Sequence, residues 1–166
     1  NRSRAAANHR HPLPGGWGED ASLRHALALG VALAVASTAC AQERGAALYE
    51  QHCAVCHDKK GEGIPGFAPR LAGNLAERAK KESGRAYLAQ LVVSGMMGPI
   101  VSGGEKFNDA MPSFAALSDD EIVVLAGHVL GDLNGVPGEQ RITQQEVAAA
   151  RKRALPPNEV RRLREQ

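Results

Sequence analysis

Aromatic residues and cysteines are both scarce in this chain. Aromatic residues make up 4% of its 166 residues, and the sequence has three cysteines in all. So few cysteines exclude a scaffold built on disulfides. So few aromatic residues indicate a small peptide core, in which a bound apolar group would be the largest buried body. We therefore expect folding to depend on a ligand that binds the native state.

The sequence also lacks a strong charge imbalance and a long apolar run. Its net charge is +2, and no basic patch is interleaved with aromatic residues, so nucleic-acid binding is not expected. The apolar run 26–36 is too short to predict a membrane span.

Residues 1–41 have the pattern of an export signal. Arginines precede the apolar run, and small residues then lead into Ala39-Cys40-Ala41, an A-x-A cleavage pattern. We predict a leader over 1–41 and a periplasmic protein. Cleavage before Cys40 would instead leave a cysteine that could carry lipid, and only that alternative predicts membrane anchoring.

The most informative stretch is Cys53-Ala54-Val55-Cys56-His57. Two thiols three positions apart, followed by a histidine, are typical of covalent haem attachment, in which the imidazole becomes an iron ligand. A zinc site would need a second ligand pair at suitable spacing, and none follows Cys56. A thioredoxin-like site would need a strand before the motif and an alternating βα pattern after it, whereas this sequence favours short helices.

The residues before this motif add a family resemblance. Gly45 and Tyr49 lie eight and four positions before Cys53, on one face of a helix predicted over 43–52. With these residues the sequence resembles a class I cytochrome c, in which such a glycine and aromatic residue pack against the C-terminal helix. The resemblance implies an all-α fold of short helices and loops around one covalently bound haem c, over a domain at 42–135.

The resemblance also implies roles for residues after the motif. Cys53 and Cys56 would bind the haem covalently, and His57 would be one axial ligand of the iron. In the family, a proline carbonyl accepts a hydrogen bond from the ligand imidazole. Pro69 is the best match, Pro65 is the second, and such a bond fixes the imidazole tautomer.

Met111 is the expected second axial ligand. It precedes Pro112 in a stretch that resembles the Met-Pro motif of the family and leads into a helix. Met96 and Met97 are assigned to core filling or pocket lining. His128 is expected to pack or form a hydrogen bond in a helix. Candidates for the haem propionate contacts, none of which is selected, are Arg70, Arg85 and Asn108.

Capping signals predict the remaining helices. Asn74 is expected to cap a segment reaching residue 81, and Ser83 a helix over 85–94 that ends at Gly95. Ser118 begins a capping box for a helix expected to stop at Gly131. Beyond 135, the sequence predicts a basic, partly helical extension at 136–166. Its alanine-rich helix, capped by Thr143, suggests weak docking or mobility.

The resulting functional hypothesis is a periplasmic, non-enzymatic electron carrier with one haem that cycles between Fe(II) and Fe(III). Its expected partners are redox proteins, namely a donor dehydrogenase and an acceptor oxidase or reductase. One alternative is a cytochrome subunit or electron-entry module of a periplasmic dehydrogenase or terminal reductase. Another is a haem-based ligand sensor or peroxidase-like protein, which needs a vacant or displaceable sixth site.

Overall fold

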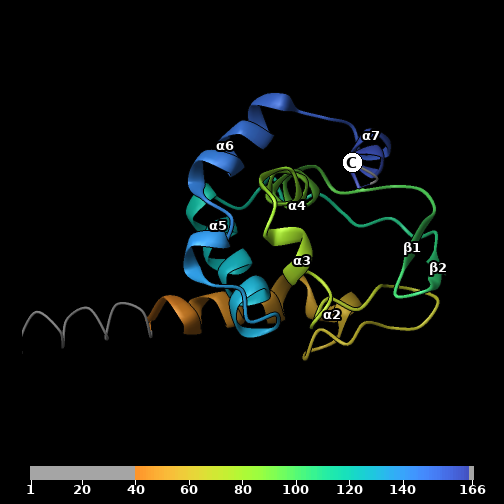
Figure 1. Ribbon diagram of the computed structural model, residues 1–166, viewed down its shortest axis with the longest axis horizontal. Coiled ribbons are helices and arrows are strands. Elements are labelled where there is room, and N and C mark those ends of the chain that lie inside the picture. Colours follow the sequence, from red (N-terminus) through yellow and green to blue (C-terminus); the bar gives the residue numbers. More distant parts are fainter. Residues whose placement is uncertain (1–39, 165–166) are drawn as a thin grey trace, which may run out of the picture. The chain divides into compact units, whose positions relative to one another are not determined.

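The computed structural model describes residues 40–164, which form helices and one short hairpin (Figure 1). The all-α prediction is confirmed, and the only strands within the described residues form a hairpin for which no sequence signal was identified. The elements in chain order are a helical segment 40–52, α2 (Ala54–His57), α3 (Ala76–Ala79), α4 (Glu82–Ser94), β1 (Ile100–Ser102), β2 (Glu105–Phe107), α5 (Asp119–Gly127), the π-helical turn η1 (His128–Asp132), the 3₁₀ turn η2 (Gly138–Gln140), α6 (Gln144–Arg153) and α7 (Pro157–Leu163).

The helical segment 40–52 crosses the end of α5 at Gly45. A Cβ atom there would lie 2.6 Å from the carbonyl oxygen of Val124 and 3.0 Å from Cβ of His128, so only glycine permits this approach. One turn later, the ring of Tyr49 packs against that of His128 at 5.3 Å. Packing of Gly45 and Tyr49 against the C-terminal helix of the family fold is therefore confirmed.

The capping box predicted at Ser118 is present, because its hydroxyl and the Glu121 side chain each accept from the other residue's backbone N–H. The predicted stop at Gly131 is wrong. The helix continues through η1, whose last residue is Asp132, and Gly131 lies inside that turn. A Cβ atom at Gly131 would lie 2.5 Å from Cζ of Arg141, so this glycine admits a guanidinium rather than ending the helix.

Two other predicted caps are also wrong. The Asn74 amide does not cap α3 but donates to the Arg70 carbonyl oxygen and the Ser102 hydroxyl, at 3.2 and 3.1 Å. It therefore ties the loop before α3 to β1. Helix α4 begins at Glu82 after Lys81, ahead of the Ser83 cap, and it ends as expected at Gly95, which has φ +72°.

The hairpin pairs β1 with β2 antiparallel, with Ile100 opposite Phe107. Gly103 and Gly104 form its turn with φ values of +59° and +83°. Positive φ at both central residues is the conformation of the two-residue turns that match strand twist.

The C-terminal extension is firmly packed, so the expectation of weak docking is wrong. Helix α6 contacts α4 and α5, and α7 contacts α4 (Figure 1). Val147 and Val160 have no exposed surface and belong to the same apolar cluster as the buried residues of α4 and α5. Ala150 of α6 is buried, and the Gln90 amide of α4 donates to its carbonyl oxygen at 3.1 Å. The Thr143 cap of α6 is confirmed by a complete capping box.

None of the helices within residues 40–164 has the length and apolar character needed to cross a bilayer. The predicted leader, apart from the exposed residues Cys40 and Ala41, lies outside the described residues.

The crossing at Gly45 generates a stability prediction. Gly45→Ala should lower the free energy of unfolding of the haem-loaded protein by about 1–3 kcal/mol, because the clash outweighs the better helix propensity of alanine. Gly127 is the matched control, since a Cβ atom there meets nothing within 4 Å. Gly127→Ala should be neutral or stabilising by up to about 1 kcal/mol. Urea unfolding measures both, and equal effects would contradict the close-approach argument.

Docking of the extension can be tested in the same way. Val160→Ala should cost about 1–3 kcal/mol of unfolding free energy, because it leaves a cavity beside α4. Gln145→Ala, at an exposed position of α6, should change it by less than about 0.5 kcal/mol. If Val160→Ala is as neutral as this control, the extension is not part of the core.

Candidate haem site

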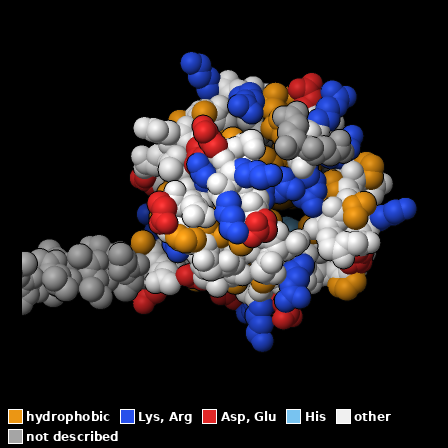
Figure 2. All heavy atoms as spheres, in the orientation of Figure 1, with side chains coloured by type: hydrophobic (Ala, Val, Ile, Leu, Met, Phe, Trp, Pro, Cys, Tyr) orange, Lys and Arg blue, Asp and Glu red, His pale blue; other side chains and the backbone are white. Residues whose placement is uncertain are grey.

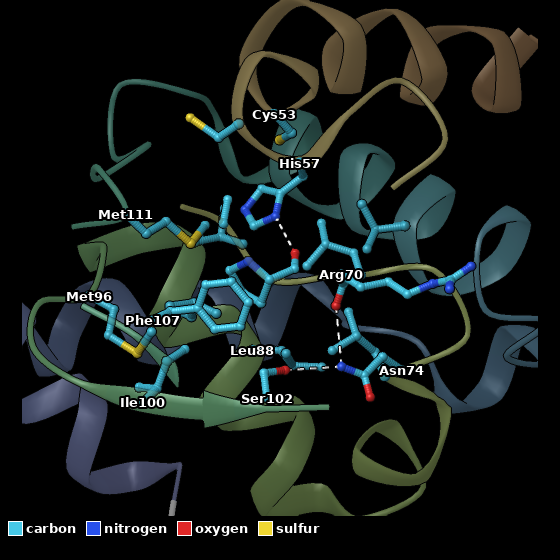
Figure 3. Close-up of a pocket in the computed structure, with 18 of the residues that line it drawn as sticks. Cys53, His57, Arg70, Asn74, Leu88, Met96, Ile100, Ser102, Phe107 and Met111 are labelled. Atoms are coloured by element: carbon cyan, nitrogen blue, oxygen red, sulfur yellow. Dashed lines mark hydrogen bonds between the residues drawn. The ribbon is translucent and has the colours of Figure 1, made fainter. Parts of the chain in front are cut away.

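A cavity of about 330 Å³ lies between α2, α4, the hairpin and the segment around Met111 (Figure 3). Its walls are mostly apolar, and they bring together three of the chain's chemical groups: the cysteine-histidine motif, the Met111 thioether and the Met96 thioether. Representative apolar lining residues are Leu88, Val92, Ile100, Phe107, Ala126 and Leu130.

One wall of the cavity is formed by the attachment motif. Backbone hydrogen bonds from Cys53 to Tyr49 and from His57 to Cys53, at 2.8 and 2.9 Å, continue the helical path through the motif. Residues three and four positions apart lie on one face of a helix, so Cys53, Cys56 and His57 all line the cavity. Val55 lies between the cysteines and is 75% exposed, at the mouth of the cavity.

The imidazole of His57 is buried and points into the cavity (Figure 3). Its Nδ1 lies 2.9 Å from the carbonyl oxygen of Pro69. Burial lowers the pKa of His57, against a smaller opposite effect of this hydrogen bond, and thus favours the neutral ring. A neutral ring that donates from Nδ1 to Pro69 keeps the lone pair of Nε2 available to a metal.

The loop that presents Pro69 is folded back on the motif. Gly63 donates its backbone N–H to the His57 carbonyl oxygen at 2.9 Å, with φ at +76°. A Cβ atom at Gly63 would lie 2.7 Å from the carbonyl carbon of Pro69. This glycine therefore allows the loop to pass close beneath the imidazole.

Tyr49 braces the motif from the side away from the cavity. Its hydroxyl donates to the Asp58 carbonyl oxygen at 2.7 Å, just past the histidine. Burial, with smaller effects of Cys53 and Asp58, raises the pKa of Tyr49 to about 12, so the hydroxyl remains a donor. Burial, followed by the nearby Cys56, likewise raises the pKa of the Cys53 thiol to about 11.

Met111 is held on another segment of the cavity wall by its backbone. It forms an antiparallel bridge with Met96, in which the two N–H···O distances are 2.9 and 3.0 Å. The residues after it are tied to the end of α4: the Ser113 hydroxyl donates to Val93 at 2.6 Å, and the Phe114 N–H donates to Val92 at 3.0 Å. The loop carrying Met111 is thus fastened to a helix along its length.

The Met96–Met111 pairing places a second thioether in the same cavity. Met96 is buried, and the Tyr87 hydroxyl donates to its sulfur at 3.7 Å. In Figure 3 the sulfur atoms of Met96 and Met111 both lie at the same side of the pocket. The sequence assigned Met96 to core filling or lining, but it carried no signal for the backbone bridge or for the Tyr87 contact. Met97 is 56% exposed.

The far end of the cavity is polar. Asn74 and Ser102 lie there, opposite Cys53 (Figure 3), and Arg70, Arg78 and Arg164 also line the cavity. Of the candidate propionate contacts, only Arg70 is among them. Asn108 lies in a neighbouring hollow, and Arg85 is paired with Glu146 at 3.0 Å.

This set of groups fits a haem. Two thiols at one edge match the two vinyl groups to be attached, and a neutral imidazole and thioethers are the iron ligands that c-type sites use. The apolar walls suit the porphyrin faces, while the polar far end suits its carboxylates.

Comparison with known proteins agrees with this chemistry. Residues 41–129 match the family described as "Cytochrome C oxidase, cbb3-type, subunit III". The chain is 42% identical over 131 residues to a protein named cytochrome c-552 from Thermus thermophilus, covering 77% of this chain and 88% of the relative. A second cytochrome c-552 from the same species is 43% identical over 122 residues, covering 72% of this chain and 92% of the relative.

These matches cover the attachment motif, and they extend well beyond it into the rest of the chain. Together with the CxxCH cysteines and histidine at one cavity wall, they show that the chain belongs to the c-type cytochromes: it is a single-haem electron-transfer protein with covalently attached haem c, and not an enzyme.

Proposed function

We propose that this chain carries single electrons between proteins through a haem iron bound by His57 and Met111. Cys53 and Cys56 hold the haem covalently, and Pro69 orients the His57 ring. The observation that carries this assignment is that His57 and Met111 line one cavity, each on a segment fixed by backbone hydrogen bonds.

The bound haem supplies the Fe(II)/Fe(III) couple, and the chain supplies ligands that need not move. The Pro69 carbonyl holds the imidazole tautomer by accepting from Nδ1. The bridge to Met96 and the bonds to α4 restrain the Met111 backbone. Ligands held in one arrangement in both oxidation states limit the geometric change on electron transfer. A histidine and methionine pair also favours a relatively positive potential.

The methionine assignment has a direct test, because two thioethers line the cavity. In the haem-loaded protein, Met111→Ala should abolish the sulfur-to-iron charge-transfer absorption band of the ferric state and lower the reduction potential. Met96→Ala removes the partner thioether of the same backbone bridge and is the matched control. It should keep the band.

The reverse pattern, with the band lost only in Met96→Ala, would reassign the ligand to Met96. A wild-type protein that is high-spin, or that readily binds carbon monoxide, would contradict the carrier assignment. It would instead favour the sensor or peroxidase-like alternative, which needs an open sixth site.

We further propose that partner proteins approach the mouth of the cavity beside the attachment motif. Val55 and Phe67 both line the cavity and are 75% and 45% exposed, so the rim around the haem edge is apolar. The partners are a donor dehydrogenase and an acceptor oxidase or reductase. Export to the periplasm is part of this proposal and rests on the leader pattern at 1–41, with lipid anchoring through Cys40 as the alternative.

The apolar rim predicts which surface governs electron exchange. Electron self-exchange between ferric and ferrous copies of the chain, measured by NMR, needs no identified partner. Val55→Asp should slow it several-fold, because the approaching rims would repel each other and lose apolar contact. Met97→Asp makes the same kind of change at another exposed apolar residue that lies outside the cavity lining. Equal slowing of self-exchange by both variants would contradict the proposal that electrons are exchanged through this rim.

A second candidate function is that of an electron-entry subunit within an oxidase or dehydrogenase complex. The family matched by residues 41–129 is described as an oxidase subunit, and that observation favours it. Copurification of the haem-loaded chain with a catalytic subunit, at a fixed ratio and through gel filtration, would support it. A monomer recovered alone from native extracts would support the diffusing carrier.

A further inference from the structure

The polar end of the cavity contains two guanidinium groups that reach it from distant parts of the chain. Arg78 belongs to α3, whereas Arg164 follows α7 at the end of the described residues. The Arg78 guanidinium donates from Nη1 to the Arg164 carbonyl oxygen at 3.2 Å. The Arg164 guanidinium donates from Nη2 to the Val101 carbonyl oxygen of β1 at 3.0 Å. These bonds draw α3, the hairpin and the end of the extension together.

The two positive charges have no carboxylate partner within residues 40–164. Neither forms an ion pair there, and Asp109, which also lines the cavity, forms none with them. Arg78 also stacks over the Tyr87 ring at 4.9 Å. Burial, and then the charge of Arg164, lowers the pKa of Arg78, so the pair is electrostatically unfavourable without an anion.

The position of this pair identifies the anion. Figure 3 shows Cys53 at one end of the pocket and Ser102 and Asn74 at the other. Arg164 is bonded to Val101, the residue before Ser102, so it lies at the end remote from the cysteines. A haem carries its two carboxylates on the edge opposite its two vinyl groups. When the vinyl edge is attached at the cysteines, the carboxylate edge therefore faces Arg78 and Arg164.

Figure 2 shows the same region from outside. Lys and Arg side chains gather beside a hollow among α3, the end of α7 and the hairpin. Arg78 and Arg164 line both the haem cavity and the neighbouring hollow, so their charges lie between the cofactor site and solvent.

We propose that Arg78 and Arg164 bind a haem propionate, so that the C-terminal extension completes the haem site. Guanidinium groups bind carboxylates through paired, charge-assisted hydrogen bonds, which suits this role. The assignment rests on the proposed placement of haem between His57 and Met111. It gives the extension a part in tuning the cofactor, besides its part in the core.

The reduction potential of the haem-loaded protein tests this proposal. Positive charge beside the haem favours the ferrous state. At a fixed redox poise, Arg164→Gln and Arg78→Gln should therefore each lower the ferrous-to-ferric ratio several-fold. Arg164→Lys, which keeps the charge, should largely restore the ratio. Arg162→Gln makes the same charge change at an exposed position of α7 outside both hollows, and should leave the ratio near the wild-type value.

A second readout locates the effect on the propionate itself. The propionate bending band in resonance Raman spectra should shift in Arg78→Gln and Arg164→Gln but not in Arg162→Gln. If both variants retain full haem content, a wild-type band and a potential no different from that of Arg162→Gln, the proposal is wrong.

An experimental structure of the wild-type haem-loaded protein makes the test independent of how the variants fold. A propionate oxygen within about 3 Å of either guanidinium is expected, and both guanidiniums turned away from the propionates would overturn the assignment. The proposed function fails separately, when the wild-type chain carries no covalent haem or lacks the low-spin, methionine-ligated spectrum.

Discussion

The structure depends on holding two wall segments, which carry the proposed iron ligands His57 and Met111, in place around one apolar cavity. The first segment, carrying His57, continues a helix that is locked onto α5 at Gly45. The second, carrying Met111, is bonded to the end of α4 and to Met96. Helices α4 and α5 belong, with α6 and α7, to one apolar cluster. Because α4 and α5 also line the cavity, the packing of this core holds the cavity walls in place.

The sequence could predict those parts of the fold that local signals encode. Capping boxes at Ser118 and Thr143 begin their helices as expected, and the spacing of Cys53, Cys56 and His57 needs no tertiary information to place them on one face. Gly131 shows the limit of such reasoning. A glycine near the end of a helical pattern usually marks a stop, but here it makes room for Arg141, which lies ten residues further on.

What the sequence could not predict depends on contacts between distant residues. The bridge between Met96 and Met111 joins segments fifteen positions apart, and neither has a strand pattern. Arg78 and Arg164 meet across 86 positions. The docking of α6 was also underestimated, because alanine contributes little apolar area by itself. Contacts of α6 with α4 and α5, with Val147 fully buried in the shared apolar cluster, supply the packing that composition alone does not reveal.

The extension and the haem are thermodynamically coupled if the extension, through Arg164, takes part in binding the haem propionate. A ligand that binds only the docked arrangement stabilises it, and by linkage the docked arrangement binds that ligand more tightly. Val160 holds α7 against α4 whether or not an anion is bound. The mutual repulsion of Arg78 and Arg164, in contrast, is relieved only when an anion is bound. Apolar packing therefore fixes the position of α7. The charges of Arg78 and Arg164 make the stability of that position depend on the bound cofactor. In this arrangement, a substitution in the extension alters the reduction potential of the haem iron, although no residue of the extension is a ligand of that iron.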